Sequence, residues 1–159
     1  MRITVEQILS LGGTLMAVVI GAVFLTISFG ILLSRLLGQS RDFGILSGGS
    51  VGICGASAAL AISAVLPQNK DSERNTIFTV ISVTALSTIA MIAYPPIAQW
   101  FGLDAQQAGV FLGATIHDVA QVVGAGYSMS DETGDTATVV KLLRVAMLVP
   151  IIACLSPGG

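Results

Sequence analysis

The chain has 159 residues, of which 53% are hydrophobic and only 10% are charged, and its formal net charge is −2. Soluble domains carry roughly 25% charged residues, so this composition excludes an ordinary water-soluble domain and predicts an integral membrane protein with the lipid bilayer as its solvent. Basic residues neither cluster nor alternate with aromatic ones, so nucleic acid is not expected as a partner.

Uncharged runs indicate where the membrane segments lie. Residues 7–34 and 75–103, for example, contain no Asp, Glu, Lys or Arg, and about 20 helical residues suffice to cross a bilayer core of about 30 Å. The first run lacks a small-x-small cleavage site, so we expect a retained span and not a removed signal. The sequence predicts an all-α integral membrane protein with a single membrane domain, residues 1–159, and about five membrane segments, at about 13–37, 43–66, 76–94, 105–127 and 136–156.

Local signals set the expected ends of these segments. Gly38 suits the C-cap of the first segment, and Pro67 ends the second. The Pro95–Pro96 pair is expected to break the third helix after Tyr94. The acidic stretch "SMSDETGD" is expected to be a solvated loop that precedes the fifth segment.

The second and fourth segments differ from the others because they are rich in glycine. Glycines at a spacing of four residues allow helix backbones to pack closely, and an intact packing helix is one interpretation. Glycine also costs about 1 kcal/mol per interior helix position relative to alanine. The four glycines between residues 48 and 55 therefore favour the other interpretation, a broken helix of the kind found in secondary transporters.

The path of the two broken segments is open at this stage. Arg35, Arg41, Lys70 and Arg74 flank the second segment, whereas only acidic residues flank the fourth. If both segments cross the membrane, the basic loops lie on opposite faces; if both are re-entrant, they share one face. The charges favour re-entrance, but each segment is long enough to cross, so crossing with a break is the leading expectation.

Four ionisable residues lie inside predicted membrane segments, where charge is costly and marks functional sites. His117 and Asp118 are in the fourth segment, with Gln121 one turn from His117, and Lys141 and Arg144 share a face of the fifth. If Asp118 pairs with one cation, the other cation remains available for a ligand. Together with the N–H groups exposed at a helix break, this unpaired cation favours binding of an anion. His117 can carry a proton near neutral pH.

Other interpretations of these residues remain open. His117 and Asp118 could form a buried pair that only orients two helices, and Lys141 could extend to the membrane interface. Cys54 and His117 could belong to an intramembrane thiol enzyme, and the chain could be a non-catalytic assembly subunit. The two cysteines, Cys54 and Cys154, have no metal-type spacing, so neither a metal nor a cofactor is expected.

Three stretches, "GICGASAALA", "GATIHDVAQVVGAG" and "ATVVKLLRVAMLVP", resemble in order and spacing the YeiH-like family of bacterial inner-membrane proteins, which are described as sulfate exporters. In two positions the chain departs from the family pattern: Asp118 stands where glutamate is usual, and Gly52 where serine is usual. The motif positions carried over are Cys54, Gly55, Ala56, Ser57, Gly113, His117, Asp118, Ala120, Gln121, Val122, Lys141 and Arg144.

The resemblance implies a multi-pass protein of the bacterial inner membrane and a secondary transporter built from two inverted halves. Members of the family are longer, so a second copy or a missing second half is an expected partner. The expected substrate is a small oxyanion such as sulfate or a sulfonate, and no enzymatic activity is expected. The residues expected to bind it are Arg144, Lys141, Ser50, Cys54, Gly55, Ser57 and Gln121, with His117 and Asp118 in proton coupling or charge pairing.

Overall fold

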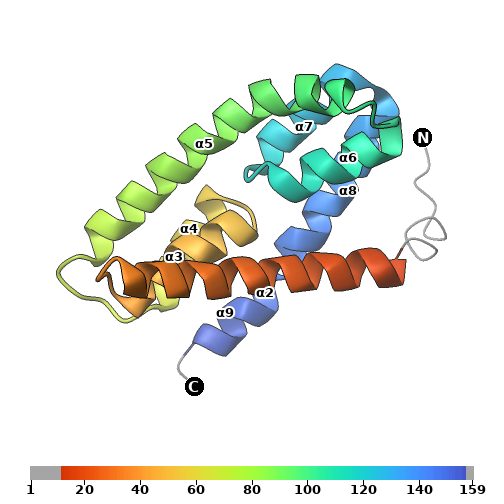
Figure 1. Ribbon diagram of the computed structural model, residues 1–159. Helices are drawn as coiled ribbons and strands as arrows, with labels where there is room; N and C mark the ends of the chain where they lie inside the picture. Colours follow the sequence, from red (N-terminus) through yellow and green to blue (C-terminus); the bar gives the residue numbers. More distant parts are fainter. Residues whose placement is uncertain (1–11, 157–159) are drawn as a thin grey trace.

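The computed structural model describes residues 12–156, and this part of the chain is helical without a β-strand (Figure 1). The prediction of an all-α protein is therefore confirmed. The helices are α2 (Gly12–Leu36), α3 (Arg41–Gly52), α4 (Ala56–Val65), α5 (Ser72–Trp100), α6 (Ala105–Thr115), α7 (Val119–Met129), α8 (Asp131–Ala146) and α9 (Leu148–Leu155).

Three helical stretches are long and apolar enough to cross a membrane. They cover Met16–Leu36, Ser72–Trp100 and Asp131–Leu155, and the last consists of α8 and α9. Their outer surfaces carry large apolar side chains that the rest of the chain leaves uncovered, such as Leu25 with 73% exposure and Ile81 with 63%. Exposed apolar surface of this extent is favourable in lipid and unfavourable in water.

The third segment is longer than predicted, because α5 continues through Pro95 and Pro96 to Trp100. The predicted break after Tyr94 is wrong. The two prolines remove two backbone donors, but ending the helix there would leave more unpaired backbone groups in apolar surroundings. The helix ends instead near Gly102, whose φ of 66° favours glycine.

The fifth segment begins at Asp131 and not at residue 136, because the "DETGD" stretch forms the first turns of α8. The prediction of a solvated loop is wrong there. The Ser130 hydroxyl accepts a hydrogen bond from the Thr133 N–H at 3.1 Å and caps the helix. Asp131 and Glu132 then lie in the first turn, where the helix dipole favours negative charge.

The second segment is interrupted as its glycines suggest, between the end of α3 at Gly52 and the start of α4 at Ala56. Gly55 has φ 74° and ψ −128°, a conformation that other residues rarely adopt. A Cβ on Gly55 would lie 3.3 Å from Cγ1 of Val83. The backbone conformation therefore favours glycine strongly at this break, and any other side chain would also make a tight contact with α5.

After the break the chain turns back, so that α3 and α4 form a re-entrant pair that we call the first hairpin (residues 41–65). α3 runs antiparallel to α2, with Gly44 against Ile31 and Gly48 against Ile27. The end of α4 returns to the start of α3, since Ser40 and Ser63 line the same small cavity. The first hairpin thus enters and leaves beside the C-terminal end of α2.

The fourth segment forms a second hairpin (residues 105–129) with its break at residues 116–118. α6 runs alongside α8, and a Cβ on Gly113 would lie 2.9 Å from Cβ of Val140. α7 returns in the opposite direction, and a Cβ on Gly126 would lie 2.8 Å from Cα of Gly134. Both ends of this hairpin therefore lie beside the N-terminal end of α8.

The geometry follows the re-entrant alternative and not the leading expectation that both broken segments cross. The longest hairpin arm, α3, has 12 residues, which at 1.5 Å per residue reach about 18 Å and fall short of a bilayer core of about 30 Å. Figure 1 shows the α3–α4 and α6–α7 pairs against the longer helices α2, α5 and α8. Because the two hairpins enter from opposite ends of the molecule, their tips point toward each other.

Candidate functional site

The tips of the two hairpins meet beside the middle of α5. Gly55 in the first tip lies against Val83 and against the carbonyl group of His117 in the second tip. The backbone N–H of Asp118 donates a hydrogen bond of 2.9 Å to Oγ of Ser87. Because Val83 and Ser87 are one helical turn apart, both breaks lie at the same level of α5.

Arg144 of α8 reaches both tips with its guanidinium group. Nε donates to the carbonyl oxygen of Gly52 at 2.8 Å, and Nη2 donates to that oxygen and to the carbonyl of Val51 at 3.1 Å. Nη1 donates to the carbonyl of Ala114 in the second tip. Val51 and Gly52 end α3 and Ala114 lies in the last turn of α6, so one side chain caps two helix C-termini.

Lys141, one turn before Arg144, caps only the second hairpin. Its Nζ donates to the carbonyl oxygen of Ile116 at 2.8 Å. Lys141 is fully buried and Arg144 is 6% exposed. Carbonyl groups at a helix C-terminus lack intrahelical partners and carry partial negative charge, which explains how two cations can be buried here without carboxylates.

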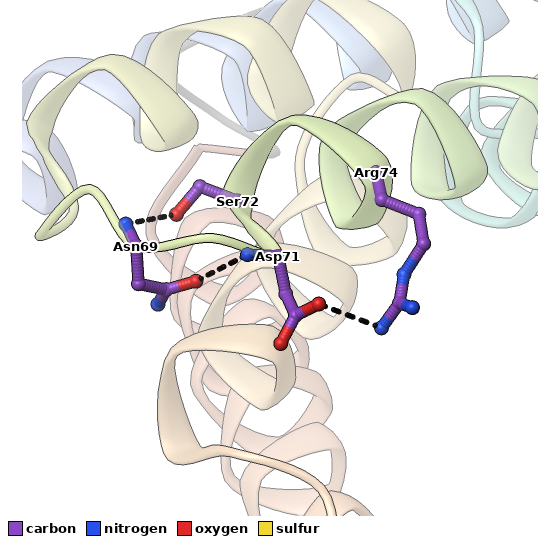
Figure 2. Close-up of polar contacts among 4 residues, drawn as sticks. All are labelled: Asn69, Asp71, Ser72 and Arg74. Atoms are coloured by element: carbon purple, nitrogen blue, oxygen red, sulfur yellow. Dashed lines mark hydrogen bonds and ion pairs between the residues drawn. The ribbon is translucent and has the colours of Figure 1, made fainter.

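The expected ion pair between Asp118 and a cation is not formed. Among residues 12–156, the single ion pair joins Arg74 and Asp71 at 3.1 Å, at the exposed start of α5 (Figure 2). There it accompanies a turn in which the Asn69 N–H donates to Ser72 Oγ at 2.8 Å. The contacts of Asp118 are different.

Asp118 caps α7, since its carboxylate accepts a hydrogen bond from the Ala120 N–H at 2.8 Å. The neighbouring His117 is half-buried, and its Nδ1 is buried without a hydrogen-bond partner. The His-Asp sequence thus ends one helix arm and starts the next.

The residues predicted to coordinate a ligand are brought to the tips to different degrees. Cys54 and Gly55 are buried in the first tip, and Ser57 follows them in the first turn of α4 with an exposed side chain. Ser50 is buried, and its hydroxyl donates to the carbonyl of Leu46 at 2.5 Å. Ser50 is therefore engaged within α3.

Gln121 extends from α7 toward α5, where its Nε2 donates to Oγ1 of Thr88 at 2.9 Å while its Oε1 is buried without a partner. Sequence reasoning missed both Thr88 and Ser87, the hydroxyl residues of α5 that contact the second tip. Two adjacent hydroxyls in the middle of an apolar span are a signal that could have indicated them.

The charges at the tips leave a positive excess. Lys141 and Arg144 contribute two positive charges and Asp118 one negative charge. The C-terminal ends of α3 and α6 each add about −0.5, and the N-terminal ends of α4 and α7 each about +0.5, so the helix dipoles cancel. The N-cap of α4 is Gly55, which has no side chain to cap the helix, so the N–H groups of Ala56 and Ser57 can donate to an anion.

Comparisons with known proteins agree with the membrane assignment. The family model described as "Conserved hypothetical protein 698" matches residues 1–157. A UPF0324 membrane protein of Chlorobaculum tepidum is 70% identical over 98% of this chain and 44% of its own length. A UPF0324 membrane protein of Rhizobium meliloti is 56% identical over 98% of this chain and 45% of its own length. UPF0324 membrane protein TauZ of Paracoccus pantotrophus is 57% identical over 98% of this chain and 46% of its own length.

The chain thus spans less than half the length of these curated relatives. No solved structure matches it significantly. The relatives are membrane proteins by name, and the chain has helices of crossing length and composition, so the protein is a membrane protein. The predicted resemblance is confirmed, and the chain belongs to the UPF0324 family of membrane proteins, the YeiH-like family.

Proposed function

We propose that this chain forms part of a multi-pass secondary transporter, not an enzyme, that carries a small oxyanion such as sulfate or a sulfonate across the bacterial inner membrane. One observation carries the proposal: two buried cations and two interrupted helices meet at one place, and neither cation is ion-paired to a carboxylate among the described residues. A site with a net positive charge in a medium of low dielectric constant attracts an anion strongly.

The donors available to an anion are the N–H groups of Arg144 and Lys141 that make no hydrogen bond within the described part of the chain. A guanidinium group has five N–H donors, and Arg144 makes four hydrogen bonds with them. Lys141 has three donors and makes one hydrogen bond. The remaining donors, the first N–H groups of α4 and the Ser57 hydroxyl would hold the anion, and Cys54, Gly55 and Gln121 would border it.

His117 and Asp118 are suited to couple the anion to a proton. The buried Nδ1 of His117 has no partner, and imidazole changes charge near neutral pH. Protonation of His117 would add a positive charge beside the tips when the anion binds. Deprotonation of His117 would remove that charge when the anion is released. Because relatives are more than twice as long, a second half or a second copy would complete the path across the membrane.

Thermal unfolding of the purified chain in detergent tests this proposal. Chloride, sulfate, thiosulfate and short sulfonates are compared at constant ionic strength. A ligand at about 100 times its dissociation constant stabilises the folded state by about 2.7 kcal/mol, which raises the melting temperature measurably. Stabilisation by one oxyanion that is lost in Lys141→Gln and kept in Arg74→Gln supports the proposal, since Arg74 lies in an exposed ion pair away from the tips.

Absence of stabilisation by every anion, in a preparation that melts cooperatively, would count against an anion site in this chain. The same measurement on a relative of full length then distinguishes two cases. Binding there would assign the missing part of the site to the second half, and no binding there would reject oxyanion transport.

A further inference from the structure

The two hairpins pack mainly on different long helices, which define two units, and α9 also contacts α4 of the first hairpin. The first hairpin packs on α2, where Gly30 and Gly48 bring the backbones of α2 and α3 together. The second hairpin packs on α8 through Gly109, Gly113 and Gly126. The contacts between the hairpins themselves lie at the tips, where Gly55 meets His117 and Val119 packs against the core of the first hairpin.

Arg144 bridges these units. It belongs to α8 and so to the second unit, yet three of its hydrogen bonds go to the carbonyl groups of Val51 and Gly52 in the first. Its remaining bond goes to Ala114 in its own unit. Lys141 lies one turn away on the same helix and bonds only to Ile116, which is also in its own unit.

The chemistry of arginine is required for this bridge. The guanidinium group presents donors on three nitrogen atoms in one plane, so it can bind carbonyl groups on two sides at once. A lysine ammonium group is a point charge at the end of a flexible chain and lacks the planar fork. Arg144→Lys therefore keeps the charge at the tips while it removes the geometry that spans both hairpins.

We propose that Arg144 is a positioning residue that holds the two hairpin tips together, and that release of its bonds to Val51 and Gly52 lets the first hairpin separate from the second. The inference extends the proposed function, because separation of the tips would open the candidate anion site to one end of the molecule. Its test needs no anion, so it can fail or succeed independently of the transport proposal.

Distances between spin labels on the two tips test the bridge. Ser57 in the first tip and Ala120 in the second are both exposed, so Ser57→Cys and Ala120→Cys can carry labels in a background with Cys54→Ser and Cys154→Ser. We expect one narrow distance distribution with Arg144 present and an additional longer component in Arg144→Lys. Lys141→Met, which loses a bond within the second unit only, should keep the narrow distribution.

Alkylation of Cys54 provides a second measurement. Cys54 is 3% exposed and lies beside Gly52, and Cys154→Ser leaves it as the only thiol. We expect alkylation in Arg144→Lys to be roughly tenfold faster, which corresponds to about 1.4 kcal/mol less free energy for opening. Lys141→Met should not accelerate it, because Lys141 bonds only to the carbonyl of Ile116 in its own unit.

An unchanged distance distribution and unchanged alkylation in a cooperatively melting Arg144→Lys would overturn the inference. Equal broadening in Arg144→Lys and Lys141→Met would do so too, because it would indicate general loosening and not loss of a bridge. If Arg144→Lys does not melt cooperatively, Arg144→Gln takes its place in the distance measurement with the same expected result, because its amide has donors on a single nitrogen atom and cannot span both hairpins.

Discussion

Arg144 and Gly52 are 92 residues apart in the chain and are joined by a hydrogen bond of 2.8 Å from the guanidinium Nε to the carbonyl oxygen. The bond places a buried cation on the C-terminal end of α3, where the helix has unpaired carbonyl groups and partial negative charge. Arg144 therefore serves the fold and the electrostatics of the candidate site together, and its removal should affect both.

Arg144→Leu should destabilise the protein by at least about 2 kcal/mol, because buried carbonyl groups that lose a partner cost roughly 1–3 kcal/mol each. Denaturant titration or thermal melting in detergent measures the loss. Arg74→Leu is the matched control: its ion pair with Asp71 has side chains that are 75% and 59% exposed, and such pairs contribute less than about 1 kcal/mol. Similar losses in both variants would contradict the assigned role of Arg144.

Gly113→Ala should destabilise the protein by roughly 1–3 kcal/mol, because overpacking of a tight interface costs about that much. Its Cβ would lie 2.9 Å from Cβ of Val140 and would also clash with the carbonyl of Ala137. Gly124→Ala, in the other arm of the same hairpin, should be neutral or stabilising, because its Cβ would meet only Sδ of Met91 at 3.5 Å. Melting temperatures of the two variants, measured side by side, check the predicted contrast.

Asp118→Asn should leave stability nearly unchanged, because asparagine is as good an N-cap as aspartate and can accept the same hydrogen bond from Ala120. It also removes the one negative charge at the tips, so anion binding should become tighter. Anion titrations followed by melting temperature measure this change. Asp118→Ala should lose stability through the missing cap by about 0.5–2 kcal/mol, and equal behaviour of the two variants would argue against this assignment.

The re-entrant hairpins predict the orientation of the chain. The loops and helix ends beside the first hairpin carry Arg35, Arg41, Lys70 and Arg74, and the opposite end of the described chain carries only acidic charges in its loops and helix ends. Because basic loops stay in the cytoplasm, the first hairpin should enter from the cytoplasmic side.

Single cysteines in a background with Cys54→Ser and Cys154→Ser test this orientation. A reagent that cannot cross membranes should label Gln106→Cys in whole cells and should label Glu73→Cys only after the cells are opened. Both positions are exposed, so the side of the membrane on which each cysteine lies decides whether it is labelled in whole cells. Labelling of Glu73→Cys in intact cells would reverse the orientation, and labelling of both from outside would contradict a crossing of the membrane by α5, which lies between the two positions.

The membrane class, the helical fold and the two breaks could be predicted from the sequence, because each depends on local composition. A chain with 10% charged residues cannot cover itself in water, and dense glycines weaken a helix wherever it lies. Lys141 and Arg144 were likewise expected on one helix face, and both cap carbonyl groups at the tips.

Only the tertiary structure decided the direction of the chain after each break and the partners of the buried charges. Whether a broken helix continues or returns depends on the few backbone angles at residues such as Gly55 and on packing against α2 and α8. Arg144 binds backbone carbonyl groups, which every residue has and which therefore leave no signal in the sequence. Its guanidinium becomes a bridge because two helix ends distant in the chain are brought to the same place.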